Sequence, residues 1–179
     1  YEVVMYIERA LEPLVRRYSE NFKIVAVTGP RQVGKTTMLK HLMEEEAESG
    51  VDRVYVTLDN TAILQTAKED PALFLQRYRP PVLIDEIQKA PELLPYIKMI
   101  VDERDDCGSV WITGSQPLHL MKAVSESLAG RVGIVEMLGL SHSEVAGTPS
   151  EPYLPSADYF MRRVDMAKPF GVSEAYRQI

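Results

Sequence analysis

Residues 29–36 read Gly-Pro-Arg-Gln-Val-Gly-Lys-Thr, and this stretch limits the possible folds more than any other part of the chain. It matches the pattern G-x-x-x-x-G-K-[ST], in which glycines let the backbone curl so that successive amides point inward at phosphate oxygens. The pattern requires a strand before the loop and a helix after it. Residues 24–28 form a short, apolar, β-prone run, and residues 37–43 repeat apolar side chains at helical spacing. The sequence therefore predicts a strand, a phosphate-binding loop and a helix in succession.

The residue types in the loop predict a nucleotide site that includes a metal ion. Lys35 can reach the β- and γ-phosphates, and the Thr36 hydroxyl can bind Mg²⁺. The alternative is a glycine turn that binds no ligand. The residues expected to contact the nucleotide are Gly29, Pro30, Arg31, Gln32, Val33, Gly34, Lys35, Thr36 and Thr37.

Two carboxylates follow a second apolar strand, over residues 81–85. Asp85 at the end of such a strand lies beside the phosphate loop in a parallel sheet, where it can hold Mg²⁺, usually through water. Glu86 is expected on the other side of the strand, where it can polarise a water for attack on the γ-phosphate. The alternative is a solvated strand end. A glutamate at this position favours an ATPase, because a kinase must avoid activating water.

A third apolar strand, over residues 109–114, ends in Ser115 and Gln116. These polar side chains are expected between the two motifs, where they could contact the γ-phosphate or orient the attacking water. They could also cap a helix, since Pro117 is a favoured first helical residue. The sequence does not choose between Ser115 and Gln116.

Arg131 follows a predicted helix whose apolar face includes Leu118, Met121 and Leu128, and which Gly130 ends. An arginine between a helix and the last strand can be a solvated charge. It can also stabilise phosphoryl-transfer charge in a neighbouring subunit, as an arginine finger does. The second interpretation implies a homo-oligomer.

Four phrases resemble one known family. They are Gly-Pro-Arg-Gln-Val-Gly-Lys-Thr-Thr (29–37), Leu-Ile-Asp-Glu-Ile-Gln-Lys-Ala-Pro-Glu-Leu-Leu (83–94), Ile-Thr-Gly-Ser-Gln (112–116) and Ser-Leu-Ala-Gly-Arg-Val (127–132). In this order and spacing, from about Tyr6 to Ser141, the chain is similar to the prokaryotic AAA-type (AAA+) ATPases with a C-terminal domain of unknown function.

The resemblance implies a module that binds ATP and Mg²⁺ on a sheet of order 5-1-4-3-2. It assigns Lys35 and Thr36 to nucleotide and metal, Asp85 and Glu86 to the acidic pair, and Ser115-Gln116 to the sensor position. Arg131 would take roughly the arginine-finger position. Family chains continue beyond residue 179, so the resemblance also predicts that the lid helices and the partner domain are missing or cut short.

Composition limits the remaining possibilities. Of 179 residues, 45% are hydrophobic and 26% charged, which is ordinary for one α/β domain with a substantial core. The net charge of −6 and a pI near 5.2 provide no basic surface for nucleic acid. Cys107 is the single cysteine, so no internal disulfide can form. No apolar stretch approaches the ~20 residues of a membrane span, and no signal peptide precedes the domain, which favours a cytoplasmic protein without membrane contact.

Strands alternate with helices along the chain, which predicts a mostly parallel sheet covered on both faces. We expect strands near 23–28, 53–58, 81–85, 109–114 and 132–138. Apolar spacing over residues 7–22 predicts a helix that Pro13 bends or restarts. This helix could pack on the core or border the adenine. Residues 62–78 suggest a helix broken near Asp70-Pro71, and residues 93–101 an amphipathic helix.

The sequence leaves the role of Asp59 open but predicts a domain boundary near residue 140. Asp59, at the end of the second strand, could be a turn residue or assist the metal site, and we favour the turn. Prolines and glycine between residues 147 and 155 suggest a linker, so we predict an ATP-binding domain over residues 1–140 and, over 141–179, a linker that begins a truncated C-terminal region.

The leading functional hypothesis is a Mg²⁺-dependent ATPase that couples hydrolysis to an unknown protein partner or C-terminal domain. One alternative is a nucleotide-gated interaction module that binds ATP but hydrolyses it negligibly. A small-molecule kinase is less favoured, because of Asp85-Glu86 and because the chain has no arginine-rich lid. A GTPase is weaker still, since no Asn/Thr-Lys-x-Asp sequence follows a strand.

Overall fold

A five-stranded sheet, with all strands parallel, forms the centre of the structure, which is a computed structural model. β1 (Ile24–Thr28) pairs with β4 (Val110–Gly114) on one side and with β5 (Val132–Glu136) on the other. β3 (Val82–Asp85) joins β4 to the edge strand β2 (Val54–Thr57). The order β2-β3-β4-β1-β5 is the expected order 5-1-4-3-2, so the predicted fold class is confirmed.

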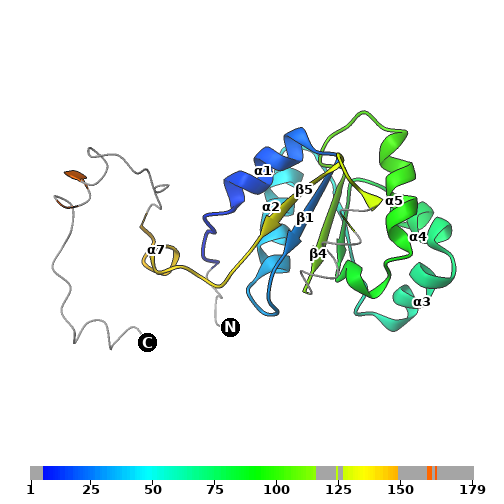
Figure 1. The fold of residues 1–179 in the computed structure, drawn as a ribbon, viewed down its shortest axis with the longest axis horizontal. Coiled ribbons are helices and arrows are strands. Elements are labelled where there is room, and N and C mark those ends of the chain that lie inside the picture. Colours follow the sequence, from blue (N-terminus) through cyan, green and yellow to red (C-terminus); the bar gives the residue numbers. More distant parts are fainter. Residues whose placement is uncertain (1–5, 116–123, 125–126, 149–160, 163, 165–179) are drawn as a thin grey trace. The chain divides into compact units, whose positions relative to one another are not determined.

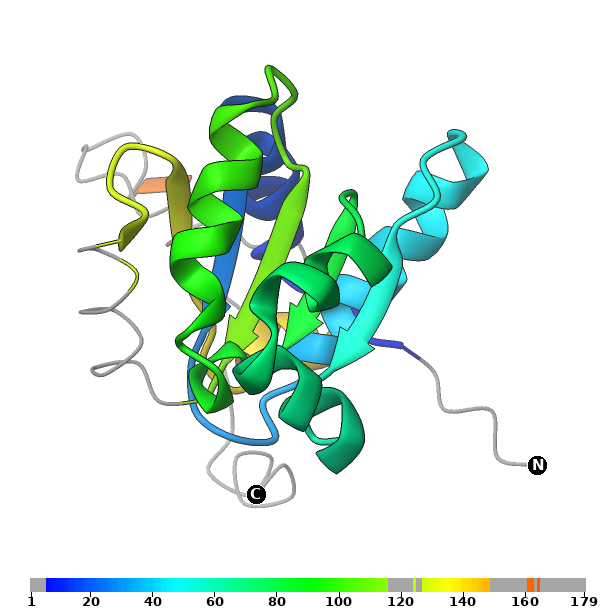
Figure 2. The same cartoon turned by 90° about the vertical axis from the view of Figure 1, so that its right-hand side faces the viewer.

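Helices cover both faces of this sheet, as Figure 1 shows: α1 and α2 lie on one face, and α3, α4 and α5 lie on the other. Figure 2 turns the second face toward the viewer. The bounds are α1 (Glu12–Asn21), α2 (Lys35–Glu48), α3 (Thr61–Glu69), α4 (Pro71–Arg77), the short 3₁₀ helix η1 (Ile87–Lys89), α5 (Leu93–Asp102) and α7 (His142–Val145).

Alternate residues of each central strand enter different layers of the core. On β1, Val25 and Val27 face the cluster that includes Leu39 of α2, whereas Ala26 faces the cluster that includes Ile97 of α5. Trp111 of β4 belongs to the first cluster and donates its indole N–H to Ser19 Oγ at 2.9 Å. Because helices cover both faces, every residue of β1, β3 and β4 is buried.

The predicted helices that lie within the described residues are present, whereas most of the helix predicted before Gly130 lies outside them. α1 begins at Glu12, so Ile7 lies before the helix. Pro13 lies in the first turn, where the missing N–H costs nothing because an amide there has no partner within the helix. The break near Asp70-Pro71 is confirmed, and the Asp70 side chain caps α4 by accepting from the Leu73 amide. β5 ends at Glu136, two residues earlier than residue 138, where the sequence-based strand ends.

The structure describes residues 6–115, 124, 127–148, 161, 162 and 164. Residues up to Thr148 belong to one unit, which includes α7 although composition assigns residues 141–148 to the linker. The reason is that the Glu144 carboxylate accepts hydrogen bonds from Arg9 and Ala10. Of the second unit, residues 149–179, the three described residues are helical and exposed. Among the described residues no helix has the length and apolarity needed to cross a bilayer.

Candidate functional site

The loop that follows β1 has the conformation that its glycines allow. Gly29 has φ +145°, and a Cβ there would lie 2.0 Å from the carbonyl oxygen of Met137. Gly34 has φ +91° and is the N-cap of α2, so the amides of the first helical turn are free to bind an anion. Gln32 also has a positive φ, +63°. The loop therefore curls at the carboxyl end of the sheet, directly before a helix N-terminus.

Lys35 folds back onto this loop. Its ammonium donates to the carbonyl oxygens of Gly29 at 3.1 Å and Pro30 at 2.7 Å, and the residue is only 5% exposed. Burial lowers the pKa of Lys35, while the nearby Glu86 and Asp85 carboxylates act in the opposite direction. The site thus holds a cation whose hydrogen-bond partners here are neutral carbonyls.

Three hydroxyl groups surround the Asp85 carboxylate. Thr36 donates to Oδ1 at 2.8 Å and Thr113 to the same oxygen at 2.5 Å, and Tyr55 donates to Oδ2 at 3.1 Å. Burial and the Asp85 charge raise the pKa of Tyr55 to about 12, so Tyr55 stays a donor at neutral pH. A hydroxyl and a carboxylate held together supply the oxygen ligands that Mg²⁺ prefers.

Glu86 follows Asp85 in the chain, but a turn positions its side chain, whereas Asp85 is positioned by strand β3. β3 ends at Asp85, and Glu86 has φ +61° and ψ +44°, a left-handed conformation that is uncommon outside glycine. Its amide donates to Thr113 Oγ1 at 3.1 Å, and its carboxylate accepts from Ser115 Oγ at 2.5 Å and from the Gln88 side-chain amide. The expected strand alternation therefore does not continue through Glu86; a left-handed turn orients this side chain instead.

Lys35, Thr36, Glu86 and Ser115 border one cleft of about 490 Å³, a volume in the range of small-molecule sites, and Asp85 lies directly behind Thr36 through their hydrogen bond. The residues present fit a nucleotide with Mg²⁺, since free helix-end amides, a buried lysine and the Thr36–Asp85 pair converge there. The cleft is lined by Arg31, Gln32, Gly34, Lys35, Thr36, Thr37, Asp59, Glu86, Lys89 and Ser115.

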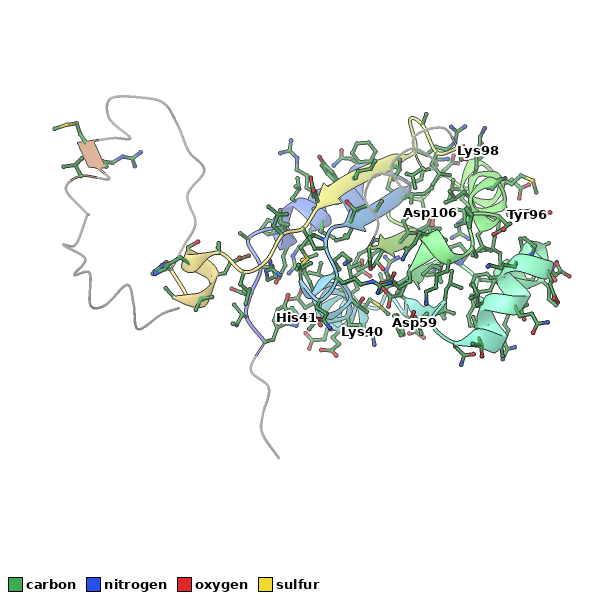
Figure 3. The ribbon with its side chains drawn as sticks, turned by 60° about the horizontal axis from the view of Figure 1, so that its bottom comes forward. Lys40, His41, Asp59, Tyr96, Lys98 and Asp106 are labelled. Carbon is green, nitrogen blue, oxygen red and sulfur yellow. The ribbon has the colours of Figure 1, made fainter. Side chains whose placement is uncertain are left out.

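Of the remaining predicted residues, Arg131 lies away from this cleft, whereas Asp59 is part of its lining. Arg131 precedes β5 at the amino end of the sheet, the edge opposite the loop, where its guanidinium pairs with Asp102 of α5 and donates to the Ala129 carbonyl at 2.9 Å. Gln116 lies outside the described residues. Asp59, labelled in Figure 3, lies in the turn after β2, as favoured from the sequence, and its carboxylate pairs with Lys89.

Sequence reasoning missed Thr113, Tyr55 and Gln88. Thr113 carries a signal, since it is a polar residue within an otherwise apolar strand, and it is fully buried. Tyr55 and Gln88 carry no signal that a single sequence reveals. The contact of Tyr55 with Asp85 depends on which strands pair, and the contact of Gln88 with Glu86 depends on the turn after β3.

Comparison with known proteins identifies the family of this chain. Residues 21–146, well over half of the chain, match the family described as AAA domain. The chain belongs to the AAA domain family. The resemblance to AAA-type P-loop ATPases seen in the sequence is thereby confirmed.

Relatives and solved structures add further detail. This chain is 33% identical over 137 residues to the uncharacterized proteins Mb2031c of Mycobacterium bovis and Rv2008c of Mycobacterium tuberculosis. The match covers 76% of this chain but 30% of each relative. The fold is similar to AMPPCP-bound DnaA from Aquifex aeolicus (TM-score 0.52, 18% identity, 75% of this chain and 48% of that chain). It is also similar to the Walker-type ATPase paby2304 of Pyrococcus abyssi (TM-score 0.53, 16% identity, 92% and 58%). At these identities the likeness concerns the fold alone.

Proposed function

We propose that this AAA domain binds ATP with Mg²⁺ and hydrolyses the bond between the β- and γ-phosphates, which gives ADP and inorganic phosphate. The observation that carries the proposal is the 2.8 Å contact between Thr36 Oγ1 and Asp85 Oδ1, with the buried Lys35 ammonium and the Glu86 carboxylate on the same cleft. This set provides an anion-binding loop, oxygen ligands for a metal and a general base within one site.

Each residue has a distinct role in this proposal. Loop amides and Lys35 bind the phosphates, and Thr36 and Asp85 hold Mg²⁺, which when bound offsets the negative charge of the phosphate oxygens. Glu86 accepts a proton from the attacking water and becomes a carboxylic acid. Ser115, which already donates to Glu86 Oε1, orients that carboxylate.

One observation favours a slower alternative. In this structure both Glu86 oxygens accept hydrogen bonds, one from Ser115 and one from Gln88, so the base is occupied by protein donors. A chain that kept this arrangement with ATP bound would be a nucleotide-gated interaction module with negligible hydrolysis. The rate of phosphate release separates the two functions.

The mycobacterial relatives are longer than the matched region. The matched part of this chain spans 30% of each mycobacterial relative. We therefore propose that nucleotide state is passed to a further domain or a protein partner. A second route is a homo-oligomer in which Arg131 reaches the site of a neighbouring subunit.

Titration calorimetry with Mg·ATP tests binding. Lys35→Ala removes the charge aimed at the phosphates, and ATP affinity should fall at least about tenfold, since charge-assisted hydrogen bonds are among the strongest contacts available. Lys68→Ala, on the exposed surface of α3, is the control and should bind as the wild type does. Equal affinity in the Lys35→Ala variant would remove the basis of the proposal.

Release of inorganic phosphate tests hydrolysis. Phosphate and ADP should form in equal amounts with Mg²⁺ present, and release should stop in excess chelator. ATP binding without measurable release would favour the interaction module. ADP formed without free phosphate would instead indicate transfer to another acceptor, as in a kinase.

A further inference from the structure

One buried arginine outside the predicted site touches the phosphate loop. Arg9 precedes α1, is 7% exposed, and donates from Nη1 to the carbonyl oxygen of Val33 at 2.8 Å. The same nitrogen lies 3.7 Å from the position that a Cβ on Gly34 would take. Arg9 therefore packs directly against the loop, from the side of the N-terminal segment.

The other donors of Arg9 hold the chain that follows β5. Nη2 donates to the carbonyl oxygens of Leu138 at 2.9 Å and Gly139 at 3.3 Å, and Nε donates to Glu144 Oε1 at 3.0 Å. The Glu144 carboxylate also accepts from the amides of Ala10 at 2.8 Å and Ser141 at 2.6 Å. One planar guanidinium thus joins the N-terminal segment, the phosphate loop and residues 138–144.

The Val33 contact has a consequence for the loop. In a trans peptide the carbonyl and the following N–H point in opposite directions. Because Arg9 binds the Val33 carbonyl, the N–H of Gly34 points away from Arg9, and Gly34 is one of the residues that line the cleft. Fixing this peptide plane holds the Gly34 amide in one orientation at the cleft.

We propose that Arg9 is a positioning residue that fixes the anion-binding conformation of the loop and couples the loop to residues 138–144. The inference rests on the proposed nucleotide binding. By linkage the coupling is reciprocal. If the contacts with residues 138–144 increase nucleotide affinity, bound nucleotide stabilises those contacts by the same free energy. Nucleotide binding in the cleft thereby changes the stability of residues 138–144, which follow β5.

A purely structural ion pair is the competing explanation, and a pair of variants separates the two. Arg9→Lys keeps the charge but has one nitrogen, which cannot reach Glu144, Val33 and Leu138 together. Glu144→Gln weakens the ion pair and leaves the Val33 contact. Arg16→Lys is the matched control, because Arg16 lies on α1, pairs with Glu45 and has a side chain 45% exposed.

Nucleotide affinity is the first measurement. Arg9→Lys should raise the Kd for Mg·ATP at least about fivefold, the low end of usual coupling between sites. Glu144→Gln should raise it by less than Arg9→Lys does, because the Val33 contact remains, and Arg16→Lys, which changes an exposed pair, should leave it unchanged. Arg9→Lys and Glu144→Gln variants of equal stability and equal Kd would overturn the proposal.

Amide hydrogen exchange provides a second measurement that needs no catalysis. Without nucleotide, exchange in peptides covering residues 29–36 should be faster in Arg9→Lys than in the wild type. In the wild type, Mg·ATP should slow exchange in residues 138–145, and this effect should disappear in Arg9→Lys. Unchanged loop exchange in the variant would overturn the inference. A wild type that binds no nucleotide would refute the proposed function instead, and the nucleotide-free comparison would still decide the role of Arg9.

Discussion

The parallel sheet has a carboxyl edge, where its strands end, and an amino edge, where its strands begin. Different ends of the helices lie at these two edges. At the carboxyl edge α2 begins, so free amides face the cleft beside Lys35. At the amino edge α5 ends, and Lys23 binds carbonyls in and after its last turn by donating to Val101 at 2.7 Å and Arg104 at 2.5 Å. The start of α2 therefore has free donors, whereas the end of α5 has two of its acceptors already bound by a side chain of the protein.

Cavity volume alone would not distinguish these edges. A cleft of about 490 Å³ also lies at the amino edge, beside Trp111. Two arginines line it, and both are paired: Arg16 with Glu45, and Arg53 with Glu46 through hydrogen bonds of 2.8 and 3.1 Å, while Arg53 also stacks 3.8 Å from the Trp111 ring. Within the described residues, Lys35 has no such carboxylate in hydrogen-bond contact. The comparison teaches that an available charge, more than available space, marks the candidate site.

The largest predicted effect would join the two edges. If Arg131 completes the site of a neighbour, the amino edge of one subunit meets the carboxyl edge of the next, and Arg131 exchanges Asp102 for phosphate. Arg131→Ala should then leave ATP binding nearly intact and lower turnover in the assembled protein by up to about 10³–10⁵. Phosphate release and calorimetry measure the two quantities.

Mixing decides whether this action is in trans. A mixture of the separate Arg131→Ala and Glu86→Gln proteins should partly recover turnover, because some interfaces would pair an intact Arg131 with an intact Glu86. Variants that co-assemble without any recovery would make Arg131 a same-subunit or structural residue.

Glu86→Gln should have the next largest effect. The change keeps the size of the side chain but removes the basic oxygen, so turnover should fall about 10²–10⁴-fold while Mg·ATP still binds. Glu20→Gln, beside the cleft at the amino edge, is the control and should keep wild-type turnover. A Glu86→Gln variant within about twofold of wild-type turnover would exclude Glu86 as the base.

Low pH should reduce the stability contributed by Glu144, near the carboxyl edge, more than the stability contributed by Asp102 at the amino edge. Burial alone would raise the pKa of Glu144, but the amides of Ser141 and Ala10 and the Arg9 guanidinium overcome it and lower the pKa to about 2. A depressed folded pKa stabilises the protein above the unfolded value, near 4.5, and this contribution is lost as the pH falls toward 2. Its size is about 3 kcal/mol.

Urea unfolding at pH 6 and pH 3 measures this loss. The stability gap between the wild type and Glu144→Gln should shrink at the lower pH. Asp102→Asn, which breaks the exposed pair with Arg131, should show a smaller change, since surface ion pairs contribute little. An equal pH dependence of the two gaps would contradict the difference between the edges.

The smallest predicted effect compares two hydroxyls at opposite ends of β4. Thr113→Val removes the donor to Asp85 and leaves the Glu86 amide without its acceptor, which should cost about 1–3 kcal/mol of unfolding free energy. Ser109→Ala, at the amino end, loses one 3.4 Å bond to the Lys23 carbonyl and should cost less. Chemical denaturation of both variants ranks them, and the reverse order would contradict the account of Asp85.

Much of the fold could be predicted because its signals are local. The apolar run of residues 24–28, the glycines of the loop and the Asp70-Pro71 break each act on their own neighbourhood. The strand order came from the family resemblance instead, since spacing does not record which strands pair. The turn at Glu86 was not foreseen, because its left-handed conformation depends on Thr113 and Ser115 from the next strand.

By itself the sequence determined the loop, the acidic pair and the alternation of strands and helices, since each depends on residues close together in the chain. Tertiary structure alone decided that Tyr55 and Thr113 surround Asp85, and that Arg9 meets Glu144 across 135 positions. The physical reason is that a buried polar group must find its partner wherever the sheet order brings one within hydrogen-bond distance. That partner can lie anywhere in the chain, so periodicity and motif spacing do not reveal it.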